Sequence, residues 1–194
     1  MSQVVLDDTT NRRNKRRRAL LAILLGSSIA TLGAGTLSLA VFTDSRAATG
    51  SWTTGTVILG VSPATAFTAT GILPGDSGSQ TITVSNTGTG ALRYAVSSAA
   101  TNADGKGLAT QLAMTVKAGA CPGAGANLYS GALGATALGS NVQGAQTGDR
   151  SVAAGATDLL CFAWSFPLAS GNTYQSAATT ATFTFDAEQT ANNP

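Results

Sequence analysis

Residues 79–98, SQTITVSNTGTGALRYAVSS, contain the clearest indication of the fold class. They consist of two runs in which apolar and polar side chains alternate, joined by the turn-forming sequence NTGTG at residues 86–90. The apolar members of the two runs are Ile82, Val84, Tyr94 and Val96. A period of two residues is typical of a β-strand with one buried and one solvated face. Because glycine tolerates the positive φ of tight turns, residues 86–90 predict a hairpin-like connection between the two strands.

The same pattern continues outward from this stretch. In TTATFTFDA, residues 179–187, Ala181, Phe183 and Phe185 alternate with polar residues. Further strands are predicted at residues 52–61, 111–117 and 157–166, with a short one at 127–130 in an alanine- and glycine-rich segment. Beyond Phe42 no run of ten residues has the apolar period of a helix. The sequence therefore predicts an all-β, antiparallel β-sandwich, jelly-roll-like, with an immunoglobulin-like topology as the alternative.

The N-terminal region has the layout of an export signal. Basic residues 12–18 (RRNKRRR) precede an uncharged, hydrophobic segment at 19–40, which predicts a signal helix over residues 1–40. Ser38 and Ala40 are the small residues that a signal peptidase accepts, so that Val41 would become the new N-terminus. The segment is also long enough for an uncleaved membrane anchor. Both interpretations place the remainder of the chain outside the cytoplasm, because the basic end stays inside.

Removal of residues 1–40 changes the charge balance. They contain six of the eleven lysines and arginines but only two of the nine acidic residues, so the remainder has a net charge of 5 − 7 = −2. This balance argues against a nucleic-acid partner. The remainder is predicted to comprise an N-terminal β-prone segment (41–61), one β-sandwich domain (62–190) that does not span a membrane, and a C-terminal tail (191–194).

The chain contains two cysteines, Cys121 and Cys161, and both lie in the exported part. The oxidising surroundings outside the cytoplasm favour a disulfide between them. Two buried free thiols are the alternative.

Few residues are suited to catalysis. The chain has no histidine, which removes the usual catalytic triads and every histidine-containing zinc site. Asp76 and Asp104 lie in glycine-rich loops where calcium could bind, but capping of turns is the commoner use of such aspartates. Trp164 is expected in the core, whereas Trp52 could stack on a sugar or belong to a segment that docks elsewhere. We therefore predict no catalytic residue, metal or cofactor.

The region AVFTDSRAATGSWTTGTVILGV, residues 40–61, resembles the start of mature proteins of the TasA/camelysin family. The matching residues are Phe42, Asp44, Gly55, Thr56 and Val57, and Trp52 lies between them. The resemblance implies a secreted jelly-roll protein, matured by a dedicated signal peptidase, that forms extracellular fibres of a biofilm matrix. It also implies that the N-terminal segment of one subunit completes the sheet of the next, with or without an accessory assembly protein. A short, uncharged, β-prone segment is independently suited to strand addition.

Three functions follow, in order of preference. The first is a secreted, non-catalytic fibre subunit whose partner is a second copy of itself, with residues 41–61 as the intersubunit strand. The second is a cell-surface binding or adhesion module. The third is a peptidase, since camelysin is described as a metalloprotease, but the absence of histidine argues against transferring that activity.

Overall fold

The computed structural model describes residues 44–194, of which Trp52–Pro194 form one compact unit and residues 44–51 belong to a separate N-terminal unit. The predicted signal peptide, its cleavage residues Ser38, Ala40 and Val41, and Phe42 lie outside the described residues. The strands are β1 (Leu59–Ser62), β2 (Ser77–Asn86), β3 (Leu92–Ala100), β4 (Ala113–Ala118), β5 (Asn127–Ala132), β6 (Ala137–Leu138), β7 (Arg150–Val152), β8 (Thr157–Ser165) and β9 (Ala181–Gln189). The helical elements are α2 (Leu108–Gln111) and the 3-10 turns η1 (Leu133–Ala135) and η2 (Asn172–Tyr174).

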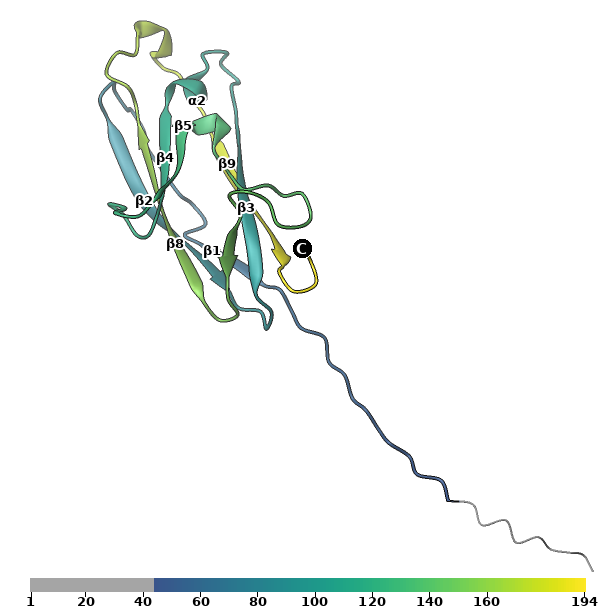
Figure 1. Ribbon diagram of the computed structural model, residues 1–194. Coiled ribbons are helices and arrows are strands. Elements are labelled where there is room, and N and C mark those ends of the chain that lie inside the picture. The colour runs from purple at the N-terminus through teal and green to yellow at the C-terminus, as the bar shows by residue number, and fades with distance from the viewer. Residues whose placement is uncertain (1–43) are drawn as a thin grey trace, which may run out of the picture. The chain divides into compact units, whose positions relative to one another are not determined.

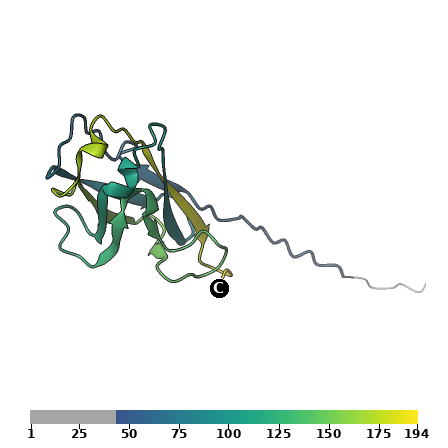
Figure 2. The same ribbon diagram turned by 90° about the horizontal axis from the view of Figure 1, so that it is seen from above.

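The strands of the compact unit form two antiparallel sheets (Figures 1 and 2). One sheet has the order β1-β2-β8-β4-β5. In the other, β3 pairs with β9 along its full length, while β6 and β7 pair with two separate parts of β3. Since a strand has two edges, β6 and β7 share one edge of β3 and β9 occupies the other. Among residues 44–194, no helix is long and apolar enough to cross a bilayer.

The hydrophobic core lies between the two sheets. Its fully buried members come from both: Val84, Met114, Val116, Leu160 and Phe162 from the first sheet, and Leu92, Tyr94 and Val96 from the second. The ring of Phe162 packs edge-on against Phe183, with centroids 5.1 Å apart. These side chains are the apolar members of the alternating runs, so the predicted antiparallel β-sandwich is confirmed. The finer jelly-roll topology stays a prediction.

The predicted hairpin at residues 86–90 is wrong. Strands β2 and β3 belong to different sheets, so this turn is an arch that carries the chain from one sheet to the other. The arch is fixed by Asn86, whose side chain is buried and donates from Nδ2 to the carbonyls of Gly90 (2.8 Å) and Val152 (3.1 Å). Its Oδ1 accepts from the backbone N–H of Gly88 at 3.0 Å. Because a buried amide without partners would be costly, these bonds hold the arch in place.

Other boundaries also differ from the predictions. Of the expected strand at 52–61, only the part in β1 is paired, and it pairs with β2 of the same domain. The expected strand at 111–117 begins later, because the short helix α2 precedes β4. The strand predicted at 127–130 is β5, and the glycine-rich region that follows contains β6 and β7, which the sequence did not predict.

The predicted disulfide between Cys121 and Cys161 is confirmed. Cys161 lies in β8, and Cys121 follows β4, the neighbouring strand. The backbone N–H of Cys121 also bonds to Oγ1 of Thr81 in β2, at 2.9 Å. The bridge therefore fastens the segment after β4 across the centre of the first sheet.

Candidate functional site

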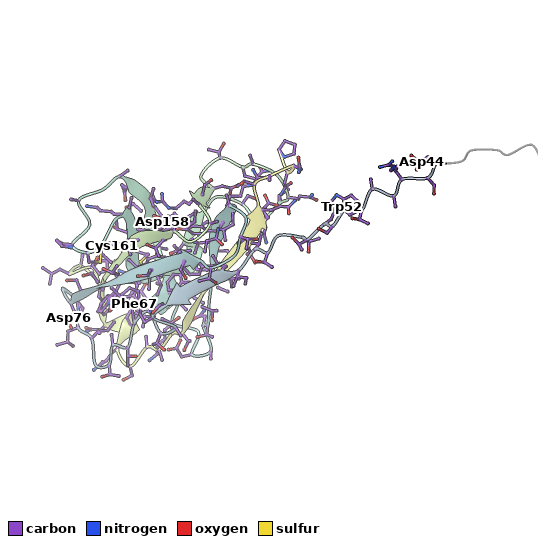
Figure 3. The ribbon with its side chains drawn as sticks, turned by 90° about the horizontal axis from the view of Figure 1, so that it is seen from below. Asp44, Trp52, Phe67, Asp76, Asp158 and Cys161 are labelled. Atoms are coloured by element: carbon purple, nitrogen blue, oxygen red, sulfur yellow. A yellow bond between two sulfur atoms is a disulfide. The ribbon has the colours of Figure 1, made fainter. Side chains whose placement is uncertain are left out.

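The segment that precedes β1, residues 44–58, belongs to neither sheet. Residues 44–58 are all exposed and have no regular secondary structure. Trp52 keeps 89% of its surface exposed, and its indole lies outside the sandwich in Figure 3. Val57 is exposed as well. A large apolar side chain in solvent at this position is a candidate contact for a partner.

The last residues of this segment are fastened to the arch. The backbone N–H groups of Thr89 and Gly90 both donate to the carbonyl of Thr56, at 3.0 and 3.1 Å. The N–H of Thr56 in turn donates to Oγ1 of Thr89 at 2.9 Å. Two residues after Thr56, the carbonyl of Ile58 accepts a hydrogen bond of 3.0 Å from the N–H of Thr87. The chain is therefore held from Thr56 onward, and the part available to a partner ends at Gly55.

Gly88 allows this close approach. A Cβ atom at residue 88 would lie 2.3 Å from the carbonyl oxygen of Thr56 and 2.9 Å from the nitrogen of Ile58. Both are backbone atoms, so neither side could yield by changing a rotamer. Glycine at this position thus couples the arch to the base of the N-terminal segment.

The substitution Gly88→Ala should therefore lower the free energy of unfolding by about 1 to 3 kcal/mol, the usual cost of overpacking. Urea denaturation would measure the change. Gly171→Ala is the matched control, because a Cβ there meets no atom within 4 Å and the backbone has φ −79°. It should be neutral or slightly stabilising. Equal losses in the two variants would show that the contact with Thr56 is unimportant.

The charged residues of the segment interact with each other only weakly. Arg46 and Asp44 form an ion pair of 3.1 Å whose side chains are 88% and 73% exposed. Exposed pairs of this kind contribute about 0 to 1 kcal/mol. Both groups are therefore available to other partners at little cost.

A polar cluster of Tyr94, Arg150 and Asp158, which the sequence did not reveal, links the two sheets. Asp158 of β8 accepts a hydrogen bond of 2.8 Å from the hydroxyl of Tyr94 in β3. It also accepts two bonds, of 2.6 and 2.8 Å, from the guanidinium of Arg150 in β7. Burial raises the pKa of Tyr94, and the hydrogen bond to Asp158 raises it further. Burial alone would raise the pKa of Asp158, but the bonds from Arg150 and Tyr94 outweigh it and lower that pKa. The cluster holds the sheets together as an ionised, hydrogen-bonded unit.

The other candidate residues have structural roles. Asp76 accepts from the N–H of Leu73 at 2.8 Å, and Asp104 accepts from Lys106 and Ala178 at 3.0 and 2.7 Å. These backbone bonds lower the pKa of Asp104. Both aspartates thus cap turns, as preferred from the sequence. Trp164 is half-buried against the core, as expected.

Two shallow hollows lie on the compact unit. The larger, about 220 Å³, is lined by alanine, glycine, threonine and asparagine. The smaller, about 50 Å³, contains Asp149, Asp186, Glu188 and Arg93. Glu188 is bonded to Arg93 at 2.5 Å, and Asp149 caps a turn by accepting from Ser140 and Gln146. Asp186 makes no side-chain hydrogen bond or ion pair within residues 44–194, which leaves it as the unengaged carboxylate of this face.

Part of the chain matches a known protein family. The family model described as "Camelysin metallo-endopeptidase" matches residues 15–117, which end within β4. No curated protein matches the chain.

The family description implies a bound metal, which would need a set of protein ligands. The whole chain has no histidine, and both cysteines are consumed by the disulfide. In the part of the chain that the structure describes, no three histidine, cysteine, aspartate or glutamate side chains are grouped so that they could hold a metal ion. Catalytic zinc sites need three protein ligands, usually with histidine among them. The residues present do not fit such a site.

Proposed function

This chain belongs to the camelysin metallo-endopeptidase family, and we propose that within it the protein is a secreted, non-catalytic structural subunit of extracellular, biofilm-matrix fibres. Its partner is a second copy of itself, joined by β-strand addition of the N-terminal segment. Signal peptidase acts on it during export, and an accessory protein can assist assembly.

The observation that carries this proposal is the N-terminal segment itself. It is exposed, has no regular structure, and is anchored at Thr56 to a domain whose buried core contains none of its residues. From Ala47 to Gly55 it contains no charge and no proline. Proline and charge are the features that usually prevent a free strand from pairing. Such a segment gains most by pairing with the sheet of a neighbour.

The non-catalytic part of the proposal rests on the ligand set described above. Without histidine or free thiol, the chain lacks the imidazole bases, thiolate nucleophiles and histidine zinc ligands on which the common hydrolases depend. Casein hydrolysis by the purified exported protein, abolished by a chelator, would contradict it.

A binding or adhesion module is the second candidate, and the exposure of Trp52 favours it. An exposed indole can stack on a sugar or fill a pocket of a surface partner. Specific binding in a glycan screen, lost in Trp52→Ala while filaments are unaffected, would support this alternative.

Deletion of residues 44–54 tests the fibre proposal. The deletion leaves residues 1–43 in place for export and keeps Thr56 on the arch. We expect the full-length chain, exported from a secreting bacterial host, to form filaments visible by negative-stain electron microscopy. The deletion variant should be folded and monomeric, because it lacks the strand that joins neighbours.

A length-matched control replaces residues 44–54 with an alternating glycine–serine sequence. It should also fail to assemble, because glycine and serine pair poorly as strands. Filaments of unchanged abundance from the deletion variant would contradict assembly through this segment.

A further inference from the structure

Strand β9 has an unpaired edge that is long and regular. Within residues 44–194 it pairs only with β3, over nine residues. Among residues 44–194, the only hydrogen bond to the β9 backbone from outside β3 is the one that Gln189 accepts from Asn193. Thr182 and Thr184 are exposed, and the rings of Phe183 and Phe185 are only half-buried although they face the core. The outer edge of β9 thus presents free backbone groups beside incompletely covered aromatic rings.

The other sheet edges are less suited to accept a strand. β1 has only four residues, and β5 has six residues with a register shift in its pairing to β4. Short strands and bulges are the devices by which proteins protect their edges. β9 has neither device, and it carries no charge from Ala181 to Phe185. It is therefore the edge that most favours strand addition.

The N-terminal segment matches this edge in length. Residues 44–55 precede the anchor at Thr56, and eight of them, extended, span about 26 Å, which covers most of β9. The remaining residues up to Gly55 can serve as a linker. For a fibre to assemble, the donor segment must come from another chain.

The charges select an orientation and a register. In an antiparallel pair, the N-terminal end of the donor lies at the C-terminal end of β9, where Asp186 and Glu188 are located. Arg46 is the only cation of the segment from residue 44 to residue 58. Glu188 is already neutralised by Arg93, whereas Asp186 is unengaged. Arg46 therefore belongs opposite Asp186.

This register also sorts the remaining side chains correctly. Directly opposite residues point to the same face of a sheet. With Arg46 opposite Asp186, both charged donor residues lie on the outer face. Asp44 then lies opposite Glu188, whose charge is already neutralised by Arg93. Ala47 and Thr49 then lie opposite Phe185 and Phe183, where their methyl groups can cover the half-buried rings. A shift of one residue would place Arg46 on the core face.

Building on the proposed function, we infer that the outer edge of β9 is the acceptor of residues 44–51 of a second copy, paired antiparallel with Arg46 opposite Asp186. The added strand is parallel in direction to β3 and keeps the extended sheet antiparallel throughout. Each subunit then offers one donor segment and one acceptor edge, which generates an open, head-to-tail filament.

Disulfide trapping tests the register. The exported products of Ala48→Cys and Thr184→Cys chains, mixed and mildly oxidised, should form a cross-linked dimer, because directly paired Cα atoms lie about 4.5 to 5.5 Å apart. The native cysteines are already bonded and do not compete. Ala48→Cys mixed with Ser130→Cys, an exposed position on β5, is the matched edge control and should not cross-link. Thr49→Cys mixed with Thr184→Cys, one residue out of register, should cross-link much less.

Charge exchange tests the pairing without cysteines. Arg46→Asp and Asp186→Arg should each raise the critical concentration for filament formation about 2- to 10-fold, since like charges directly opposite oppose pairing. The double variant should return it to within about twofold of the unchanged chain. Thermal unfolding should be the same in all of these variants.

The outcomes separate this inference from the proposed function. If deletion of residues 44–54 abolishes filaments but the trap occurs on β5, or the charge reversals do not compensate, the acceptor edge is wrong and the fibre proposal stands. If the deletion variant still forms filaments, both fail.

Discussion

Replacing both cysteines, as Cys121→Ala/Cys161→Ala, should lower the free energy of unfolding by about 4 kcal/mol. The bridge closes a loop of 40 residues, and opening it restores that conformational freedom to the unfolded chain. Alanine keeps the Cβ atom of Cys161 in the core and adds no polar group. Because a domain is stable by only about 5 to 15 kcal/mol, the loss would remove a large share of the total.

Urea denaturation of the exported protein measures this loss. The single variant Cys121→Ala should lose nearly as much as the double variant, because either change breaks the bridge. Reduction of the unchanged protein should reproduce the loss within about 1 kcal/mol. A decrease below about 1 kcal/mol in the double variant would show that the bridge does not restrict the unfolded chain in this way.

The substitution Asp158→Asn should lower the free energy of unfolding by about 3 kcal/mol, near the lower end of the range for a broken buried pair. It leaves Arg150 charged and without its partner, while its side chain is only 22% exposed. Tyr94→Phe is the graded control. It removes one hydrogen bond and leaves the ion pair, so it should lose only about 1 kcal/mol. Equal losses from the two variants would contradict the ion pair as the main contribution.

The same cluster predicts a dependence on pH. The folded pKa of Asp158 lies below its ordinary value, so its contribution to stability is fully present above the pKa of an unfolded aspartate, about 4. That contribution is lost as the pH falls through the lower folded pKa. The difference in unfolding free energy between the unchanged protein and Asp158→Asn should therefore shrink in acid, as thermal or urea unfolding at several pH values would show. A difference that stays constant to pH 2 would contradict this linkage.

The long alternating runs were the predictable part of the fold. Strands β2, β3, β8 and β9 lie within a few residues of their predicted positions, because a period of two is fixed by burial of one face. The disulfide was predictable because only two cysteines exist. The composition of residues 86–90 suits an arch as well as a hairpin, and the difference depends on the bonds of Asn86 to Val152, which is far away in sequence.

The candidate site was predictable only in part. Asp44, Gly55, Thr56 and Val57 were selected from the resemblance, and Trp52 from its place near the expected N-terminus. The structure divides these residues into a part before Thr56 and an anchored part that begins at Thr56. That division depends on contacts with Thr89 and Gly90, which no local pattern reveals. The Tyr94–Asp158–Arg150 cluster was missed for the same reason, since Tyr94 and Asp158 are 64 positions apart in sequence.

In the filament that we propose, the N-terminal segment of one chain adds a strand to β9 of the next. Amide hydrogen exchange, compared between monomer and assembled filaments, tests this pairing most directly because it reports backbone hydrogen bonds without any substitution. We predict that residues 44–51 and the outward-facing amides of β9 both become protected on assembly, while β5 is unchanged. If residues 44–51 exchange as rapidly in filaments as in the monomer, they form no intersubunit strand.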